Sequence, residues 1–128
     1  MLRQLRLTSP TTLNADGMVY PCRIGRAGVA RPHEKREGDL KTPSGQFALR
    51  GLYYRPDRLA APVTSLPTTA LTPAHGWCDD PAHPCYNQPV MLPFAGHHER
   101  LWREDSVYDL IIPLGYNDGV EAPIIPGA

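Results

Sequence analysis

Four residues that commonly bind metal ions lie within eleven positions of the chain: His75, Cys78, His83 and Cys85. Zinc accepts both imidazole nitrogen and thiolate sulfur, which makes a small zinc-stabilised module one hypothesis. Successive ligands here are three, five and two residues apart, and this order matches no standard zinc knuckle. A disulfide between Cys78 and Cys85 in an oxidising compartment is a second hypothesis, and ordinary loop residues are a third.

The three cysteines are also candidates for covalent catalysis. A reactive thiolate needs a neighbouring cation, a histidine or a helix N-terminus. Asp79 and Asp80 follow Cys78 directly and disfavour a thiolate there. Cys22 lies beside Arg23 in a predicted strand, where neighbouring side chains point to opposite faces. Neither is a convincing nucleophile, and an odd cysteine count favours a reducing compartment or one disulfide plus a free thiol.

A basic stretch suggests anion binding: Arg23, Arg26, Arg31, Lys35, Arg36 and Lys41. Three acidic residues interrupt it, and no aromatic residue lies among them to stack on bases, so we expect no nucleic-acid partner. The segment GRAGVA, residues 25–30, lacks the third glycine of a dinucleotide fingerprint and the Gly-Lys-Ser/Thr of a nucleotide loop. We therefore expect a plain tight turn there and no cofactor.

The 128 residues are enough for one domain, and 41% apolar with 20% charged residues predict a folded chain. Fifteen prolines and eleven glycines rule out long helices and favour short strands joined by loops. Lys and Arg outnumber Asp and Glu eleven to five in residues 1–64, whereas residues 65–128 have two against eight. No apolar run approaches the roughly 20 residues of a membrane span, and no secretion signal is visible.

These properties predict a mainly β protein with one or two short helices. We expect strands over residues 2–8, 18–25, 46–54 and 107–117, with a turn at 14–17 and a charged loop over 25–41. Residues 76–90 are expected to form a loop. Short helices are expected at 57–60 and at 97–104, the latter packing Leu101 and Trp102 inward. Thr42 to Gly45 reads as a tight turn in which Pro43 fixes φ and Gly45 takes a positive φ.

The segment EGDLKTPSGQFAL, residues 37–49, resembles a motif of L,D-transpeptidase catalytic domains of the YkuD type. In that family a charged, glycine-bearing loop leads into Thr-Pro-x-Gly-x-Phe and a strand. Further segments agree in order along almost the whole chain: GRAGV, YYRPDRL, GWCDDP, YNQPV, HERLWRED and YDLIIPLGYN. The resemblance implies a β-sandwich around a cleft and acyl transfer between peptidoglycan stem peptides through a cysteine thioester. It also implies a periplasmic or cell-envelope location.

The family's catalytic histidine and its Ser/Thr-x-Gly-Cys segment follow the strand that resembles YDLIIPLGYN. Neither has a counterpart in residues 1–128. We therefore expect a single domain that lacks its C-terminal catalytic segment, and no catalytic turnover from these residues alone. A non-catalytic peptidoglycan-binding domain is the alternative.

Two groups of residues are candidates for substrate binding. Stem peptides carry carboxylates, which basic side chains of the charged loop can pair with: His33, Lys35, Arg36 and Lys41. Trp77, Tyr108 and Asn117 are candidates for the wall of the cleft, although Trp77 and Tyr108 are equally candidates for the core. Residues Val107 to Leu114 are apolar on both faces and predict an interior strand. Without its neighbours this strand leaves a free edge, so we expect self-association through Val107–Leu114 or ordering by another polypeptide.

Overall fold

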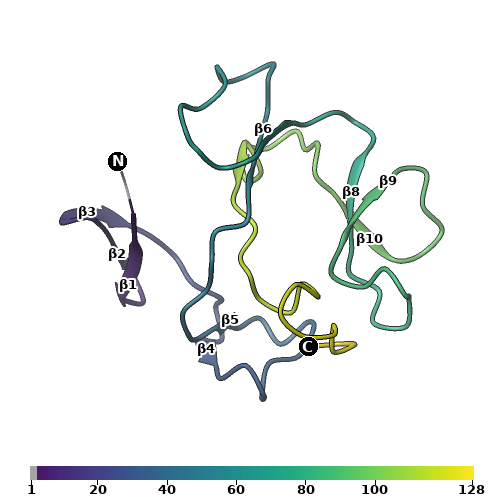
Figure 1. Ribbon diagram of the computed structural model, residues 1–128, viewed down its shortest axis with the longest axis horizontal. Helices are drawn as coiled ribbons and strands as arrows, with labels where there is room; N and C mark the ends of the chain where they lie inside the picture. The colour runs from purple at the N-terminus through teal and green to yellow at the C-terminus, as the bar shows by residue number, and fades with distance from the viewer. Residues whose placement is uncertain (1–2) are drawn as a thin grey trace. The chain divides into compact units, whose positions relative to one another are not determined.

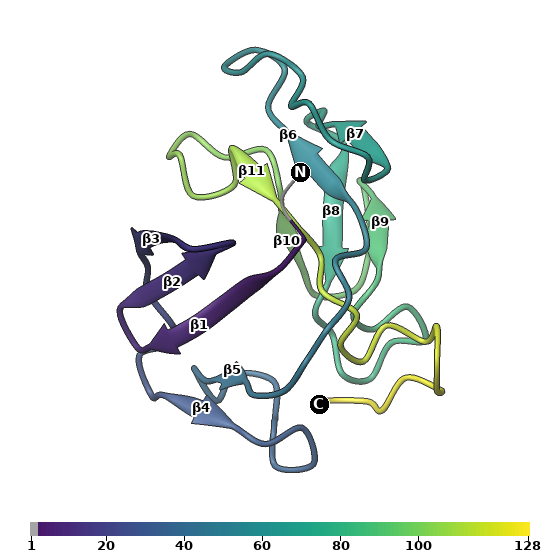
Figure 2. The same cartoon turned by 60° about the vertical axis from the view of Figure 1, so that its left-hand side comes forward.

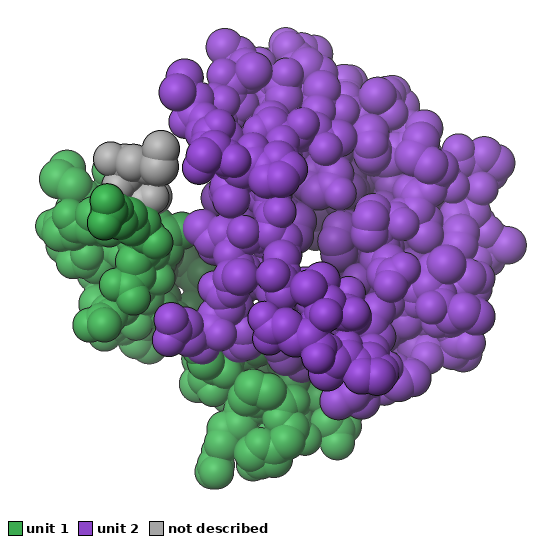
Figure 3. Space-filling view, viewed as in Figure 1, with its two compact units in different colours: residues 1–45, 128 green, residues 46–127 purple. Residues whose placement is uncertain are grey.

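The computed structural model describes residues 3–128 and is entirely β: eleven short strands form four small sheets, and no helix occurs among these residues (Figure 1). The chain divides into two compact units (Figure 3). Unit 1 holds residues 1–45 with residue 128, and unit 2 holds residues 46–127. The predicted β class is confirmed. Within residues 3–128 the structure therefore has no helix that could cross a membrane.

Unit 1 begins with a three-stranded antiparallel meander of β1 (Leu5–Ser9), β2 (Thr12–Ala15) and β3 (Met18–Pro21). The predicted turn between β2 and β3 is confirmed. Asp16 and Gly17 there have φ values of 48° and 93°, the left-handed geometry of a two-residue hairpin turn. Strand β2 was not predicted from the sequence, because a second two-residue turn, at residues 10 and 11, separates it from β1.

The charged loop follows and carries β4 (Val29–Ala30), which pairs in parallel with β5 (Thr42–Pro43). The predicted turn at Thr42 to Gly45 is therefore wrong in its first half, since Thr42 and Pro43 belong to a strand. Its second half is confirmed, because Gly45 has a φ of 138°. Gly25 packs so closely on the loop that an added Cβ would lie 2.4 Å from the Leu40 carbonyl oxygen. This close contact accounts for a glycine at position 25, so a phosphate-binding loop is not needed to explain it.

Unit 2 contains two three-stranded sheets (Figure 2). In the first, β6 (Leu52–Tyr54) is central, with β7 (Thr68–Ala70) parallel on one side and β11 (Leu110–Ile111) antiparallel on the other. In the second, β8 (His75–Cys78) is central between β9 (Pro89–Met91) and β10 (His98–Arg100), all antiparallel.

Both predicted helices are wrong. Residues 57–60 lie in a turn and the bend after it, and residues 98–100 form β10, with Glu99 opposite Trp77. An eight-residue segment is too short to hold a helix by itself, so pairing with β8 decides its conformation. The predicted loop at 76–90 is also wrong in part, because it contains most of β8 and the start of β9.

The prediction of an interior strand at 107–117 is wrong as well. Only Leu110 and Ile111 form β11, which lies at the edge of its sheet beside β6. An isolated bridge between Leu49 and Leu114 extends the contact. Pro113 has no N–H to give to a ladder, and it shortens the strand.

The core of unit 2 is small. Its buried apolar side chains are Leu52, Leu71, Cys78, Tyr86 and Leu101. One charged side chain, Arg55, is buried with them. A buried charge is stable only with partners, and Arg55 has them in the Asp57 carboxylate and the Arg103 carbonyl.

Candidate functional site

The charged loop of unit 1 is organised around the carboxylate of Asp39. Lys35 Nζ and the Lys41 backbone N–H donate to Asp39 Oδ1 at 2.8 and 2.9 Å, and the Arg36 backbone N–H donates to Oδ2 at 2.8 Å. The side chains of Lys35 and Asp39 are only 14% and 17% exposed. The hydrogen bond from Lys35, followed by that from the Arg36 backbone, lowers the pKa of Asp39 to about 2.

This arrangement separates the four basic residues predicted to bind carboxylates. Lys35 is already paired with Asp39, so a ligand would have to displace that carboxylate. Arg36 Nη1 donates to the carbonyls of His33 and Lys35 and so closes the loop on itself. The His33 side chain is 71% exposed and lies beside Glu34, and Lys41 is exposed too. The side chains of His33 and Lys41 thus face solvent, although the Lys41 backbone N–H helps to hold the loop through Asp39.

In unit 2, Asn87 joins two residues that the sequence singled out, Trp77 and Asn117. Trp77 Nε1 donates to Asn87 Oδ1 at 3.1 Å. Asn87 Nδ2 donates to the carbonyls of Asn117 and Tyr116 at 2.8 and 3.3 Å. One side-chain amide therefore ties β8 to the segment that follows β11.

Asn117 in turn fixes the segment after it. Its Nδ2 donates to the Ile125 carbonyl at 2.9 Å, and its Oδ1 accepts from the Ile125 N–H at 2.8 Å. Asn87 and Asn117 both have left-handed backbones, with φ values of 58° and 48°. Asparagine tolerates this conformation better than other residues with a side chain, and such backbones often occur at functional sites.

Arg55 and Arg58 hold the segment that carries Trp102 to Asp109. Arg55 forms two parallel hydrogen bonds of 2.9 Å with the Asp57 carboxylate, and its Nη1 donates to the Arg103 carbonyl. Its guanidinium carbon lies 3.7 Å from the centre of the Trp102 ring, a cation–π contact. The hydrogen bond to Asp57 raises the pKa of Arg55 and keeps it charged.

Arg58 completes this support from the outside. Its Nη1 donates to the Asp109 carboxylate at 2.8 Å and to the Asp105 carbonyl at 2.7 Å. Its Nη2 donates to the Glu104 carbonyl at 2.8 Å. The two arginines thus fix the backbone between β10 and β11.

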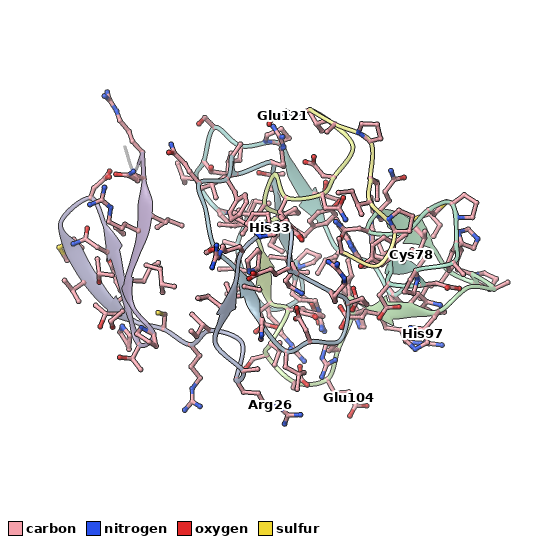
Figure 4. The ribbon with its side chains drawn as sticks, turned by 90° about the horizontal axis from the view of Figure 1, so that it is seen from below. Arg26, His33, Cys78, His97, Glu104 and Glu121 are labelled. Atoms are coloured by element: carbon pink, nitrogen blue, oxygen red, sulfur yellow. The ribbon has the colours of Figure 1, made fainter. Side chains whose placement is uncertain are left out.

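The supported segment borders an open hollow of about 460 Å³. Its lining carries both signs of charge beside one indole: His98, Glu99, Arg100, Trp102, Arg103, Glu104 and Asp105. Arg103 and Asp105 are paired with each other, and this contact lowers the pKa of Asp105 to about 2. Arg100 and Glu104 have no such partner in the lining. The Glu104 side chain extends away from the ribbon (Figure 4).

Tyr108, the third candidate for a cleft wall, lies next to this hollow. Its hydroxyl donates to Glu99 Oε2 at 2.9 Å, and the Arg103 guanidinium lies 5.4 Å from its ring centre. Burial, together with the Glu99 charge, raises the pKa of Tyr108 to about 12, so the phenol stays a hydrogen-bond donor. Tyr108 belongs to the surroundings of the hollow, whereas Trp77 and Asn117 belong to the Asn87 network.

The two histidines considered as zinc ligands accept hydrogen bonds from the backbone instead. His75 Nδ1 accepts the Thr72 N–H, and His83 Nδ1 accepts the Cys85 N–H. Across residues 3–128, no three His, Cys, Asp or Glu side chains gather closely enough to hold a metal ion. Cys22, Cys78 and Cys85 are all free thiols. Cys78 lies opposite His98 on β10 but is fully buried, and its sulfur is closed to substrate.

Three residues at the centre of these clusters were not among the predicted site residues: Asp39, Arg55 and Asn87. The Arg-Pro-Asp-Arg run at residues 55–58 is the clearest missed signal, because a proline between an arginine and an aspartate holds the two side chains close. Asn87 had a weaker signal, namely an asparagine in a proline-bearing loop where left-handed backbones are common. A comparison of the chain with protein-family profiles, with curated proteins and with solved structures found no match.

Proposed function

We propose that this chain is the framework of a YkuD-like L,D-transpeptidase β-sandwich that binds peptidoglycan stem peptides in the cell envelope. The activity proposed for such a domain is transfer of acyl groups between stem peptides through a cysteine thioester. One observation carries the proposal: the segments that resemble the family hold one another together in unit 2. Arg55 of the segment 53–59 binds Asp57 and stacks on Trp102 of the segment 98–105.

The same interlocking holds for the remaining segments of unit 2. Arg58 binds Asp109 of the segment 108–117. Trp77 of the segment 76–81 bonds Asn87 of the segment 86–90, which bonds the carbonyls at the end of 108–117. An ordered set of motifs that belongs to one domain is expected to pack in this way, and these segments lie in one compact unit.

The charge of the hollow suits the proposed substrate class. A stem peptide carries both carboxylates and an amino group, and the lining offers an arginine and a glutamate without partners in the lining. Arg100 pairs with a ligand carboxylate and Glu104 with a ligand ammonium. Because both side chains are solvent-exposed, each contact is weak, and we expect affinity in the millimolar range.

Calorimetric titration with a tetrapeptide stem tests this proposal. We expect saturable binding that is lost in the Arg100→Ala, Glu104→Ala double variant and retained in Arg6→Ala, a matched change on β1 of unit 1. Absence of binding by the unaltered chain contradicts the proposal. If the double variant binds equally well, the binding site lies outside the hollow.

A non-catalytic peptidoglycan-binding role is the second candidate, favoured by the state of the cysteines. Cys78 is fully buried, and Cys85 offers its backbone N–H rather than its thiol to His83. Incubation with tetrapeptide and intact-mass analysis tests a premise that both candidates share, namely that none of the three thiols is the nucleophile. We expect no acyl adduct on Cys22, Cys78 or Cys85. An adduct on any of the three contradicts both candidates.

A further inference from the structure

The outer edge of β11 has backbone groups that no neighbouring strand satisfies. The inner edge faces residues 48–55, the segment that contains β6. There the Asp109 carbonyl accepts from the Arg55 N–H at 3.0 Å, and the Pro113 carbonyl accepts from the Arg50 N–H at 2.9 Å. The Gly115 N–H donates to the Ala48 carbonyl at 2.8 Å. Successive residues of a strand point their backbone groups in opposite directions. The N–H and C=O groups of Leu110, Ile112 and Leu114 therefore face outward, and β11 is the last strand on its side of the sheet.

The same three residues, which we call the 110–114 edge, form an apolar strip. Leu110, Ile112 and Leu114 are 51%, 36% and 42% exposed. Being two residues apart, their side chains lie on one face of the strand. An open strand edge with exposed apolar side chains readily pairs with another strand.

The edge strand β11 is short, which is one protective device, but two others are missing here. Natural edges often carry a lysine or an outward-facing proline. Pro113 lies at the edge, but its nitrogen is on the side of the 48–55 strand, so no outward donor is lost. The one charged residue among positions 107–114, Asp109, is already bound to Arg58.

We propose that the 110–114 edge pairs with the same edge of a second copy of this chain. In an antiparallel pair centred on Ile112, each Ile112 faces its equivalent and Leu110 faces Leu114 of the partner subunit. Every facing pair is apolar, and the outward donors and acceptors of one copy match those of the other. This inference does not depend on the proposed function.

The charges that flank the 110–114 edge permit this pairing, and the small area that it buries limits the stability of the dimer. The acidic residues that flank the edge, Asp109 and Asp118, are each bound to an arginine of their own chain, Arg58 and Arg50. Two copies can therefore approach without unpaired like charges meeting. The three side chains bury far less than the roughly 800 Å² per partner of a stable interface, so the dimer is transient and depends on concentration.

Sedimentation velocity over a wide range of concentrations tests the proposal. We expect the unaltered chain to shift from monomer to dimer, and Ile112→Lys to remain monomeric because two ammonium groups then meet at the two-fold axis. Val63→Lys is the matched control, since it makes the same change at a fully exposed valine away from the edge, and it should dimerise normally. A chain that is monomeric at every concentration contradicts the proposal.

A mixing experiment guards against misfolding of a single variant. When the Leu110→Lys and Leu114→Glu variants are mixed, the proposed register places the new ammonium group of one copy opposite the new carboxylate of the other. We expect the mixture to dimerise at least about tenfold more strongly than either variant alone. Equal association of the mixture and the separate variants overturns the register, because loss of structure cannot produce rescue by mixing.

Discussion

Replacing Asn87 with alanine should destabilise unit 2 through two separable effects. The first is loss of the hydrogen bonds to Trp77 and to the carbonyls of residues 116 and 117. At about 0.5–1.5 kcal/mol each, and with one of the three long at 3.3 Å, they contribute about 1–3 kcal/mol together. The second is the backbone, because alanine at a φ of 58° costs a further 1–2 kcal/mol or so.

Substitution with glycine separates the two effects. Asn87→Gly loses the same hydrogen bonds but adopts a positive φ without strain. We therefore expect Asn87→Ala to lower the free energy of unfolding by about 2–5 kcal/mol, and Asn87→Gly to be milder by about 1 kcal/mol. Asn87→Asp keeps the acceptor for Trp77 but turns a carboxylate oxygen toward two carbonyls, and it should fall near the alanine variant.

Urea unfolding followed by tryptophan fluorescence measures these differences, since both tryptophans, Trp77 and Trp102, lie in unit 2. The slope of the transition must stay constant for the midpoints to be compared as free energies. If Asn87→Ala unfolds like the unaltered chain, Asn87 does not organise unit 2. If the glycine and alanine variants are equal, the left-handed backbone carries no strain.

Three further perturbations test other parts of the structure. Arg55→Met should lower the thermal midpoint more than Arg58→Met, because Arg55 is buried and leaves the Arg103 carbonyl unpaired; the reverse order would show that the outer arginine dominates. Gly45→Val should cost roughly 1–3 kcal/mol, since valine does not tolerate a φ of 138°, and an unchanged thermal midpoint would contradict that backbone. Asp39→Asn should destabilise the charged loop at neutral pH. Because the pKa of Asp39 is lowered from 3.8 to about 2, its contribution is present above the ordinary pKa and fades as pH falls toward 2, so the two proteins should converge there. A difference that persists at pH 2 would assign the effect to something other than the Asp39 charge.

The sequence predicted structure well where local chemistry decides it. Asn-Ala-Asp-Gly at residues 14–17 forms the hairpin turn because aspartate and glycine tolerate positive φ. The predictions from sequence were wrong where pairing with residues far away in the chain decides the conformation. The segment 97–104 has the composition of a short helix, but His98 to Arg100 pair with Gly76 to Cys78, twenty or more positions away in the chain. No local pattern reveals that partner.

The same distinction holds for the candidate site: residue type pointed to some of its residues, but not to the partners that they contact. Trp77 and Asn117 stood out by residue type, and the structure joins them through one intermediate. Lys35 stood out by charge, but its pairing with Asp39 depends on a loop whose backbone is left-handed at Gly38 and Leu40. Charge alone could not separate a residue that binds a ligand from one that holds its own loop together.

A titration of the isotopically labelled chain with a tetrapeptide stem, followed by amide chemical shifts, tests whether the hollow binds a stem peptide. We expect saturable shifts in residues 98–105, with smaller shifts at Tyr108 next to the hollow. These shifts should vanish in the Arg100→Ala, Glu104→Ala variant and persist in Arg6→Ala. Shifts confined to unit 1, or none at peptide concentrations of several millimolar, would contradict the assignment of peptidoglycan binding to this framework.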